Sequence, residues 1–423
     1  MQASRKNNGS LQSAAHEVRS ADWSEPMFFR DACIPVRLGW SSPFARWQGP
    51  LAEVSSLDLA VQVTAHALAD RGLPPTEVTG IVLGWTVPQP EIFYGASTVA
   101  ARIGAPQATG AMLSQACATS AACLEAAALR VDAGLDELAM VITTDRTSNG
   151  PVLTYPAPSS PGGAPRQEHW VLDSFRRDPW GGLSMVATAE RVAAGAGMTR
   201  EAIDQVALLR YQQYQAALAD DRAFQRAYMV PVTVPARRGE PVVIDGDVGV
   251  HPTTAEGLAK LAPPDTGGVV TFGTQTHPAD GAAGMVVTTA ARARELAHGE
   301  GIAHILGTGV ARVGKGEMPK APVPAAVAAL EHAGLGFGDV DAVTTHNPFA
   351  VNDLWFSDQT GIPLERMNSY GCSLIYGHPQ GPTGTRLIAE LLHTLRLRGG
   401  GIGLFTGCAA GDTGAAVVVR VED

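Results

Sequence analysis

Apolar residues recur along the chain in two alternating patterns. Leu57–Arg71 carries them at helical spacing, and Ala116–Ala133 is rich in the alanine and leucine typical of a buried helix. The runs Ala32–Leu38, Gly80–Leu83 and Glu137–Thr144 are short and largely apolar, which favours buried strands. Because strands and helices alternate, the pattern predicts an α/β architecture.

A stretch rich in proline and glycine then interrupts this alternation. The segment 150–180 is predicted to form neither a helix nor a central strand. The residues that exclude them are Pro151, Pro156, Pro158, Pro161, Gly162, Gly163 and Pro165. Amphipathic helices are expected after it, at 183–194 and 200–219. We therefore interpret 149–277 as an inserted domain.

The C-terminal part, 299–423, repeats the first pattern, with helices expected at 323–333 and 384–398 and strands at 340–345 and 401–406. In the first half, Cys117 begins a helix that leads to a strand ending at Thr144. In the second half, His378 precedes a helix that leads to a strand ending at Cys408. Similar units with chemically active residues at equivalent corners predict a duplicated fold, whose first half comprises 27–148 and 278–298.

Composition narrows the class of protein. The chain has 423 residues, of which 45% are hydrophobic and 17% charged, an ordinary globular balance with room for several domains. A net charge of −10 argues against a general nucleic-acid binder. The apolar runs are too short for a membrane span. Residues 1–26 have no apolar core of the signal-peptide kind, so we expect a flexible extension.

The cysteines indicate a reducing compartment. Their number is odd and their spacing shows no tight pattern: Cys33, Cys117, Cys123, Cys372 and Cys408. No C-x-x-C is present. The sequence therefore predicts free thiols in a cytoplasmic protein, with neither a disulfide framework nor a metal site.

Three residues in loops of small residues offer the groups that nucleophilic acyl transfer requires. Cys117 precedes an expected helix, whose dipole and amides should lower the thiol pKa. His378 can accept the thiol proton, and Cys408 can move a proton on a second substrate. The alternative for each is structural, a buried cysteine or a loop histidine, and Cys123 in the helix body is expected to be core only.

Eight short motifs, taken in order, resemble those of the thiolase family and span roughly residues 30–423. Cys117–Ala121 resembles the family pattern C-x-S-G, Asp145–Pro151 resembles E-S-M-S-N-A-P, and Met185–Glu190 resembles M-G-x-T-A-E. Thr271–Thr276 with Asp280–Ala283 is similar to T-x-G-N-A-S with D-G-A-A, and Met318–Ala325 is similar to M-G-x-G-P-x-x-A. His346–Ala350 resembles N-E-A-F-A, Gly377–Gly384 resembles G-H-P-x-G-x-S-G, and Cys408–Gly414 resembles C-x-G-G-G-x-G.

The resemblance implies two βαβαβαββ halves in a five-layer α-β-α-β-α arrangement, with helices between two five-stranded sheets. A loop domain, 149–277, would cover coenzyme A. The implied activity is thiolytic cleavage of a 3-oxoacyl-CoA, or Claisen condensation of acyl-CoAs, through an acyl-Cys117 intermediate. Coenzyme A and acyl-CoA would be substrates, with no permanently bound cofactor. Family members are commonly homodimers or homotetramers.

The resemblance also implies roles for single residues. His378 would serve as base and help to hold the thioester oxygen of the second substrate. His346 replaces an asparagine, as in the branch that includes the sterol-carrier-protein thiolases, and would stabilise an oxyanion, oriented by Asn347. The backbone N–H groups of Cys117 and Ala410 would form a second oxyanion hole.

For coenzyme A, Met185 and Thr276 match positions that contact pantetheine, and Phe349 borders the acyl end. A family arginine aligns with Val250, so its contact is absent or moved. Candidates to replace it are Arg176, Arg177, Arg237 and Arg238. The aromatic residues expected to shape the acyl pocket, or to pack the inserted domain, are Trp170, Phe175 and Trp180.

One loop departs from the family pattern. Ala409-Ala410-Gly411-Asp412 replaces the glycine run, so Ala410 must accept the dihedrals of the first family glycine, and alanine tolerates a positive φ poorly. Asp412 adds a negative charge near the site. Two alternatives therefore stay open. One is a condensing enzyme or acyltransferase with an acceptor other than coenzyme A, and the other is an acyl-CoA-binding protein without turnover.

Overall fold

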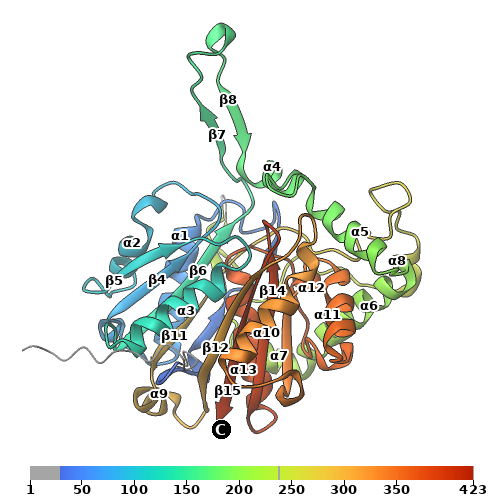
Figure 1. Cartoon of the computed structure of the whole chain (residues 1–423). Coiled ribbons are helices and arrows are strands. Elements are labelled where there is room, and N and C mark those ends of the chain that lie inside the picture. The colour runs from blue at the N-terminus through green and yellow to red at the C-terminus, as the bar shows by residue number, and fades with distance from the viewer. Residues whose placement is uncertain (1–28, 237–238, 423) are drawn as a thin grey trace, which may run out of the picture.

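The computed structural model describes residues 29–236 and 239–422, and the predicted extension 1–26 lies outside them. Two halves repeat the same strand arrangement (Figure 1). In the first, parallel strands are followed by antiparallel ones: β5 (Thr109–Leu113), β4 (Gly80–Gly84), β6 (Leu138–Arg146), β11 (Ala279–Thr289) and β2 (Gly39–Ser41). In the second, the order is β13 (Ala342–His346), β14 (Gly401–Ala409), β15 (Thr413–Glu422) and β12 (Ile302–Arg312). The predicted duplication is confirmed.

The two halves share one hydrogen-bonded sheet of 11 strands, whereas two separate sheets were expected. The link is β1 (Ala32–Pro35), which pairs with β11 on one side and with β12 on the other. The strand predicted at 32–38 is shorter than expected, because it ends at Pro35 and Val36–Leu38 form a 3-10 turn. In the second half, the strand equivalent to β5 is reduced to a single bridge between Val343 and Met367.

Two helices lie in the centre, between the strands of the two halves, and other helices cover the outer faces of the sheet (Figure 1). In the middle, α3 (Thr119–Asp132) packs against α13 (Pro382–Arg396), which is buried from Pro382 to Leu395. A side chain at Gly384 would come within 2.8 Å of Ser120, so glycine lets the two central helices approach closely. The outer layers are formed by α1 (Ser56–Asp70), α2 (Gly95–Arg102), α10 (Pro322–His332) and α11 (Ala350–Thr360).

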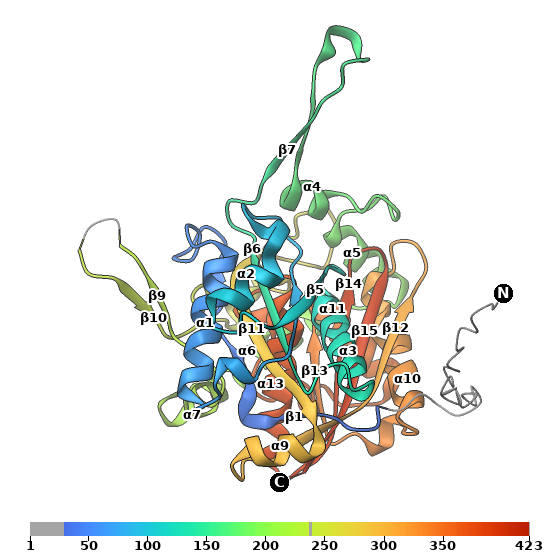
Figure 2. The ribbon, with the colours of Figure 1, turned by 90° about the vertical axis from the view of Figure 1, so that its left-hand side faces the viewer.

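The segment 149–277 differs from its predicted form at one place. Its start is a hairpin, β7 (Val152–Tyr155) and β8 (Arg166–His169), which projects from the body (Figures 1 and 2). A helix, α4 (Trp170–Arg176), follows directly within the range predicted to exclude helices. Most of the prolines lie in the hairpin connection, so α4 begins after the last of them. The remaining elements are α5 (Met185–Gly195), α6 (Arg200–Ala217), α7 (Ala219–Arg226), β9 (Val232–Val234), β10 (Val242–Ile244) and α8 (Ala255–Ala259).

Two buried ion pairs attach this segment to the body. Arg210 of α6 donates to Asp353 of α11 at 2.8 Å, and both side chains are fully buried. Arg386 of α13 donates to both carboxylate oxygens of Asp247, at 2.6 and 2.8 Å. Buried charges are costly to leave unpaired, so each pair fixes the position of the segment. None of the helices in the described ranges is long and apolar enough to cross a membrane.

Candidate active site

The turn that leads into α3 presents Cys117 at the point where the two central helices begin. Ala116 takes a φ of +46°, a left-handed conformation that is strained for alanine and common beside functional groups. At the second residue of α3, the hydroxyl of Ser120 donates to the carbonyl of Gly381 and accepts from the amide of Thr385 at 2.7 Å. This hydroxyl joins the start of α3 to the start of α13 and so places Cys117 opposite the loop of His378.

His378 contacts the thiol directly. Its Nε2 lies 3.1 Å from Cys117 Sγ, and its Nδ1 lies 2.6 Å from Thr383 Oγ1. Its backbone amide donates to the carbonyl of His277 at 2.9 Å, which fixes the loop. When Nδ1 carries the hydrogen and donates it to Thr383, Nε2 is free to accept the thiol proton.

His346, at the end of β13, lies beside His378. The two imidazole rings stack with centroids 4.0 Å apart. His346 Nδ1 lies 2.9 Å from Ser373 Oγ, and Ser373 in turn donates to Asn347 Oδ1 at 3.3 Å. Asn347 thus orients His346 through Ser373. Within the described part of the chain, His346 Nε2 is buried without a hydrogen-bond partner, which leaves it available to a substrate oxygen.

Cys408 ends β14 and lines the same cavity as Cys117. Asn352 of α11 donates its amide to Cys408 Sγ at 3.2 Å. Burial raises the pKa of the Cys408 thiol, the neighbouring Cys117 raises it further, and the Asn352 amide partly offsets this. Cys408 is therefore a neutral thiol in the free protein, held by an amide that would also stabilise its thiolate.

The loop after Cys408 corrects two sequence-based expectations. The residues with positive φ are Gly411 (+85°) and Asp412 (+59°), and Ala410 avoids the conformation that alanine tolerates poorly. Asp412 is 2% exposed and points away from the cavity, because its carboxylate accepts from the amides of Gly316 and Glu317 at 2.9 and 3.1 Å. The backbone of Ala410 faces Cys117 and lowers the pKa of the thiol through a hydrogen bond, as does the backbone of Cys117 itself.

Burial nevertheless dominates the electrostatics of the thiol–imidazole pair. It raises the pKa of Cys117 to about 12, although the backbone amides act in the opposite direction. It also lowers the pKa of His346 to about 3 and that of His378 well below its usual value, with His346 adding to the effect. The backbone amides lower the Cys117 pKa, as expected, but burial outweighs them and the net shift is upward. Thiol and imidazole are both neutral before substrate binds.

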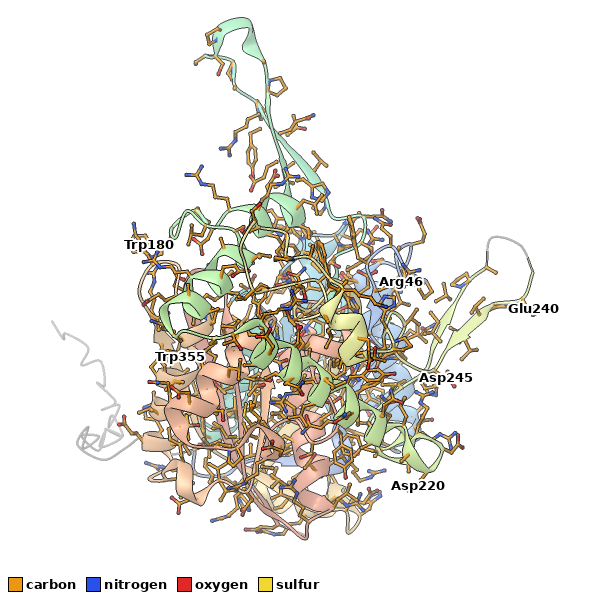
Figure 3. The ribbon with its side chains drawn as sticks, turned by 90° about the vertical axis from the view of Figure 1, so that its right-hand side faces the viewer. Arg46, Trp180, Asp220, Glu240, Asp245 and Trp355 are labelled. Carbon is orange, nitrogen blue, oxygen red and sulfur yellow. The ribbon has the colours of Figure 1, made fainter. Side chains whose placement is uncertain are left out.

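A cavity of about 960 Å³ opens onto these groups. Its wall includes Cys117, His378, Cys408 and Ala410, and also the three residues predicted to contact coenzyme A: Met185, Thr276 and Phe349. The aromatic residues Trp170, Phe175 and Trp180 line it as well. Trp180 lies at the rim of the molecule between α4 and α5 (Figure 3).

The basic candidates for the phosphates separate into three groups. Arg177 lines the cavity, whereas Arg176 points outward with a side chain 78% exposed, 3.8 Å from Asp173. Arg237 and Arg238 lie outside the described residues.

Ligand atoms of Cys117, His346 and His378 lie within 4.8 Å of one another, a spacing that also suits a metal ion. The contact between His378 Nε2 and Cys117 Sγ is a hydrogen bond, however, and two metal-bound ligands would stand farther apart. We therefore assign the group as a thiol–imidazole pair with a second imidazole. All five cysteines are free, as predicted.

Sequence reasoning missed several residues around the thiol. Gln380 Oε1 accepts from Cys117 Sγ at 3.2 Å, and Gln380 takes a φ of +68°. Asp145 is buried and accepts from the amides of Thr86, Val87 and Gly381, each at 2.8 Å, which holds the loops after β4 and before α13 together. Gln380 and Asp145 lie within segments that resemble family motifs, so the sequence marked their positions as functional candidates. Asn352 lies outside every such segment, and nothing in the sequence marked it.

The comparisons with known proteins agree with this geometry. Residues 39–291 match the family model described as Thiolase, N-terminal domain, and residues 300–421 match Thiolase, C-terminal domain. An acetyl-CoA acetyltransferase of Chromobacterium violaceum is 30% identical over 379 residues, 88% of this chain and 95% of that protein.

Two solved structures extend the comparison. Human mitochondrial 3-ketoacyl-CoA thiolase superimposes with a TM-score of 0.85 at 26% identity, covering 93% of this chain and 100% of that chain. The same human thiolase in complex with CoA gives a TM-score of 0.84 at 26% identity, covering 93% of this chain and 99% of that chain.

Proposed function

This chain belongs to the thiolase family, and we propose that it transfers acyl groups to and from coenzyme A through an acyl-Cys117 intermediate. The observation that carries the proposal is the 3.1 Å contact between Cys117 Sγ and His378 Nε2 in a cavity that Cys408 also lines. The reaction is thiolytic cleavage of a 3-oxoacyl-CoA or, in reverse, Claisen condensation of two acyl-CoAs.

In the first half-reaction, Cys117 Sγ attacks the thioester or ketone carbonyl while its proton passes to His378 Nε2. Because thiol and imidazole are neutral beforehand, the proton moves as the bond to carbon forms. The oxyanion accepts hydrogen bonds from the amides of Cys117 and Ala410. Collapse of the adduct expels the leaving group and leaves an acyl thioester on Cys117.

The second half-reaction uses Cys408. In the condensing direction, the thiolate form of Cys408, which the Asn352 amide stabilises, removes the proton next to the carbonyl of an acyl-CoA. The resulting carbanion attacks acyl-Cys117 and expels the Cys117 thiolate. His346 Nε2, which has no partner in the described residues, stabilises the enolate oxygen in the tautomer that carries the hydrogen on Nε2. In that tautomer the Ser373 hydroxyl turns from Asn347 Oδ1 and donates to His346 Nδ1. In the thiolytic direction the order is reversed. The neutral Cys408 thiol first protonates the carbanion that departs after Cys117 has added to the ketone, and the thiol of coenzyme A then takes the acyl group from Cys117 while its proton passes to His378.

We propose that segment 149–277 covers bound coenzyme A. It supplies much of the cavity wall, including Met185 and Thr276. Phe349 of the body lines the cavity beside Thr276, since Gln275 and Phe349 form a β-bridge. Thr276 is fixed there by its amide, which donates to the carbonyl of Pro348 at 2.7 Å. Arg166 and Arg177 both line the cavity, and we propose Arg177, one of the predicted candidates, for the phosphates.

The proposal is tested by intact-protein mass spectrometry after mixing with acetyl-CoA and then with longer acyl-CoAs. Wild type and C123A, which loses a buried cysteine outside the cavity, should gain one acyl mass that free coenzyme A removes. C117A should gain none. No adduct on folded wild type from any acyl-CoA would refute acyl transfer from coenzyme A and favour a binding protein or a condensing enzyme with another acyl carrier.

We also propose that the chain assembles with copies of itself. In the described residues, β5 ends the sheet with its outer edge free of a strand partner. Phe93 and Tyr94, which precede the helix packed on β5, are 78% and 68% exposed. Light scattering should give twice or four times the chain mass of 44.0 kDa. A single-chain mass would contradict self-association.

A further inference from the structure

The loop that follows Cys408 is held by a carboxylate from the inserted segment. Asp178 lies between α4 and α5 and is 5% exposed. Its Oδ2 accepts from the amide of Gly411 at 2.9 Å, and its Oδ1 accepts from the amides of Trp180 and Gly181 at 2.6 and 2.8 Å. One carboxylate therefore joins the loop at 178–182 to the loop that carries Ala410.

A second carboxylate holds the same loop from its other side. Asp412 accepts from the amides of Gly316 and Glu317, and its carbonyl accepts from the amide of Val313 at 2.8 Å. The three loops meet at Gly181, where an added side chain would lie 3.4 Å from the Asp412 carboxylate. The loop after Cys408 is thus fixed between two others.

This anchoring determines the direction of the Ala410 amide. The Gly411 amide, held by Asp178, fixes the peptide plane that follows Ala410. Thr413 Oγ1 reaches the carbonyls of Ala409 and Ala410 at 3.4 and 3.3 Å, on the peptide planes before and after Ala410. An oxyanion donor must already point at the reacting oxygen, because reorienting it during the reaction costs rate. The loop has no glycine run, so its geometry depends on these contacts.

We propose that Asp178 is a positioning residue for acyl transfer, which holds the loop so that the Ala410 amide points at the oxyanion formed on Cys117. The proposal rests on the proposed function. Asp178 touches no reacting atom. Because the loop at 178–182 also carries Trp180 of the cavity wall, Asp178 connects that wall to the oxyanion hole.

The test variant is D178N. An asparagine oxygen in the Oδ1 position retains the bonds to the amides of Trp180 and Gly181, while its NH₂ group replaces the acceptor of Gly411. The control is D339N. Asp339 is not part of the cavity wall, and its Oδ2 accepts from the amide of Gly336 at 2.8 Å.

Two rates at Cys117 separate positioning from general damage. Acylation by acetyl-CoA passes through an oxyanion, so D178N should slow it about ten- to a hundredfold. Alkylation by iodoacetamide forms no oxyanion, so its rate should fall only by the few-fold that follows when a weaker Ala410 hydrogen bond raises the Cys117 pKa. D339N should leave both rates near those of wild type. If D178N acylates as fast as an active wild type, the inference is overturned while the proposed function stands.

Amide hydrogen exchange gives a readout that does not depend on turnover. Peptides covering 408–413 should exchange faster in D178N than in wild type or D339N, because the Gly411 amide has lost its acceptor. Unchanged exchange would refute the anchor. If wild type itself forms no acyl adduct, the proposed function fails, and the role of Asp178 in acyl transfer fails with it even where exchange has accelerated.

Discussion

The imidazole rings of His346 and His378 stack 4.0 Å apart with their planes 28° from parallel. Both rings are buried, and each has its Nδ1 beside a hydroxyl, that of Ser373 or Thr383. The two Nε2 atoms are thereby left for the reaction, one at the Cys117 thiol and one without a partner in the described chain. Two stacked imidazolium ions would repel each other, so at most one of the two rings carries a charge at a time.

The first prediction concerns pH. Burial raises the Cys117 pKa to about 12, so the thiolate fraction increases about tenfold per pH unit throughout the neutral range. The rate of alkylation by iodoacetamide, followed by peptide mass mapping, should therefore keep rising from pH 6 to 10. The His378 pKa lies well below its usual value, so no inflection is expected between pH 6 and 8. A plateau in that interval would indicate a thiolate–imidazolium pair instead.

The second prediction separates the two half-reactions at His346. H346F keeps a ring for stacking but removes Nε2, so the condensation or thiolysis rate should fall about a hundredfold. Acylation of Cys117 should fall much less, because its oxyanion hole consists of backbone amides. H346N restores a donor and should recover part of the rate. Single-turnover kinetics measure both steps, and equal losses in both would contradict a role confined to the second.

The third prediction assigns proton transfer to Cys408. C408A should slow the exchange of the methyl protons of acetyl-CoA with D₂O at least about a hundredfold, while Cys117 still acquires its acyl group. C123A is the control, since it also removes a buried cysteine but one on α3 outside the cavity. Exchange that persists in C408A would mean that another base removes the proton.

The fourth prediction concerns stability. Arg210 and Asp353 are both fully buried, so R210M should lower the free energy of unfolding by about 3–5 kcal/mol, because it leaves a buried carboxylate without its cation. The matched control is R102M, whose partner Asp58 is on the surface and whose loss should cost less than about 1 kcal/mol. Urea unfolding measures both. A loss in R210M no larger than in R102M would show that the pair does not hold the segment.

The sequence by itself determined the order of elements and the loops that carry the chemistry. Periodicity placed most of the major helices and strands within a few residues, since the core faces of α1 and α6 must be apolar at helical spacing. Small residues around Cys117 and His378 marked tight turns, and their repetition in two halves predicted the duplicated fold. These features are local, so a linear pattern records them.

Tertiary structure alone decided what depends on burial and on distant partners. The pKa of Cys117 follows from how much of the chain covers it, which outweighs the helix terminus that the sequence suggested. The contacts of Asn352 with Cys408 and of Asp178 with Gly411 join segments far apart in sequence, and no spacing rule encodes them. The same holds for Ala410, whose relaxed backbone depends on Asp412 taking the left-handed turn and being held by another loop.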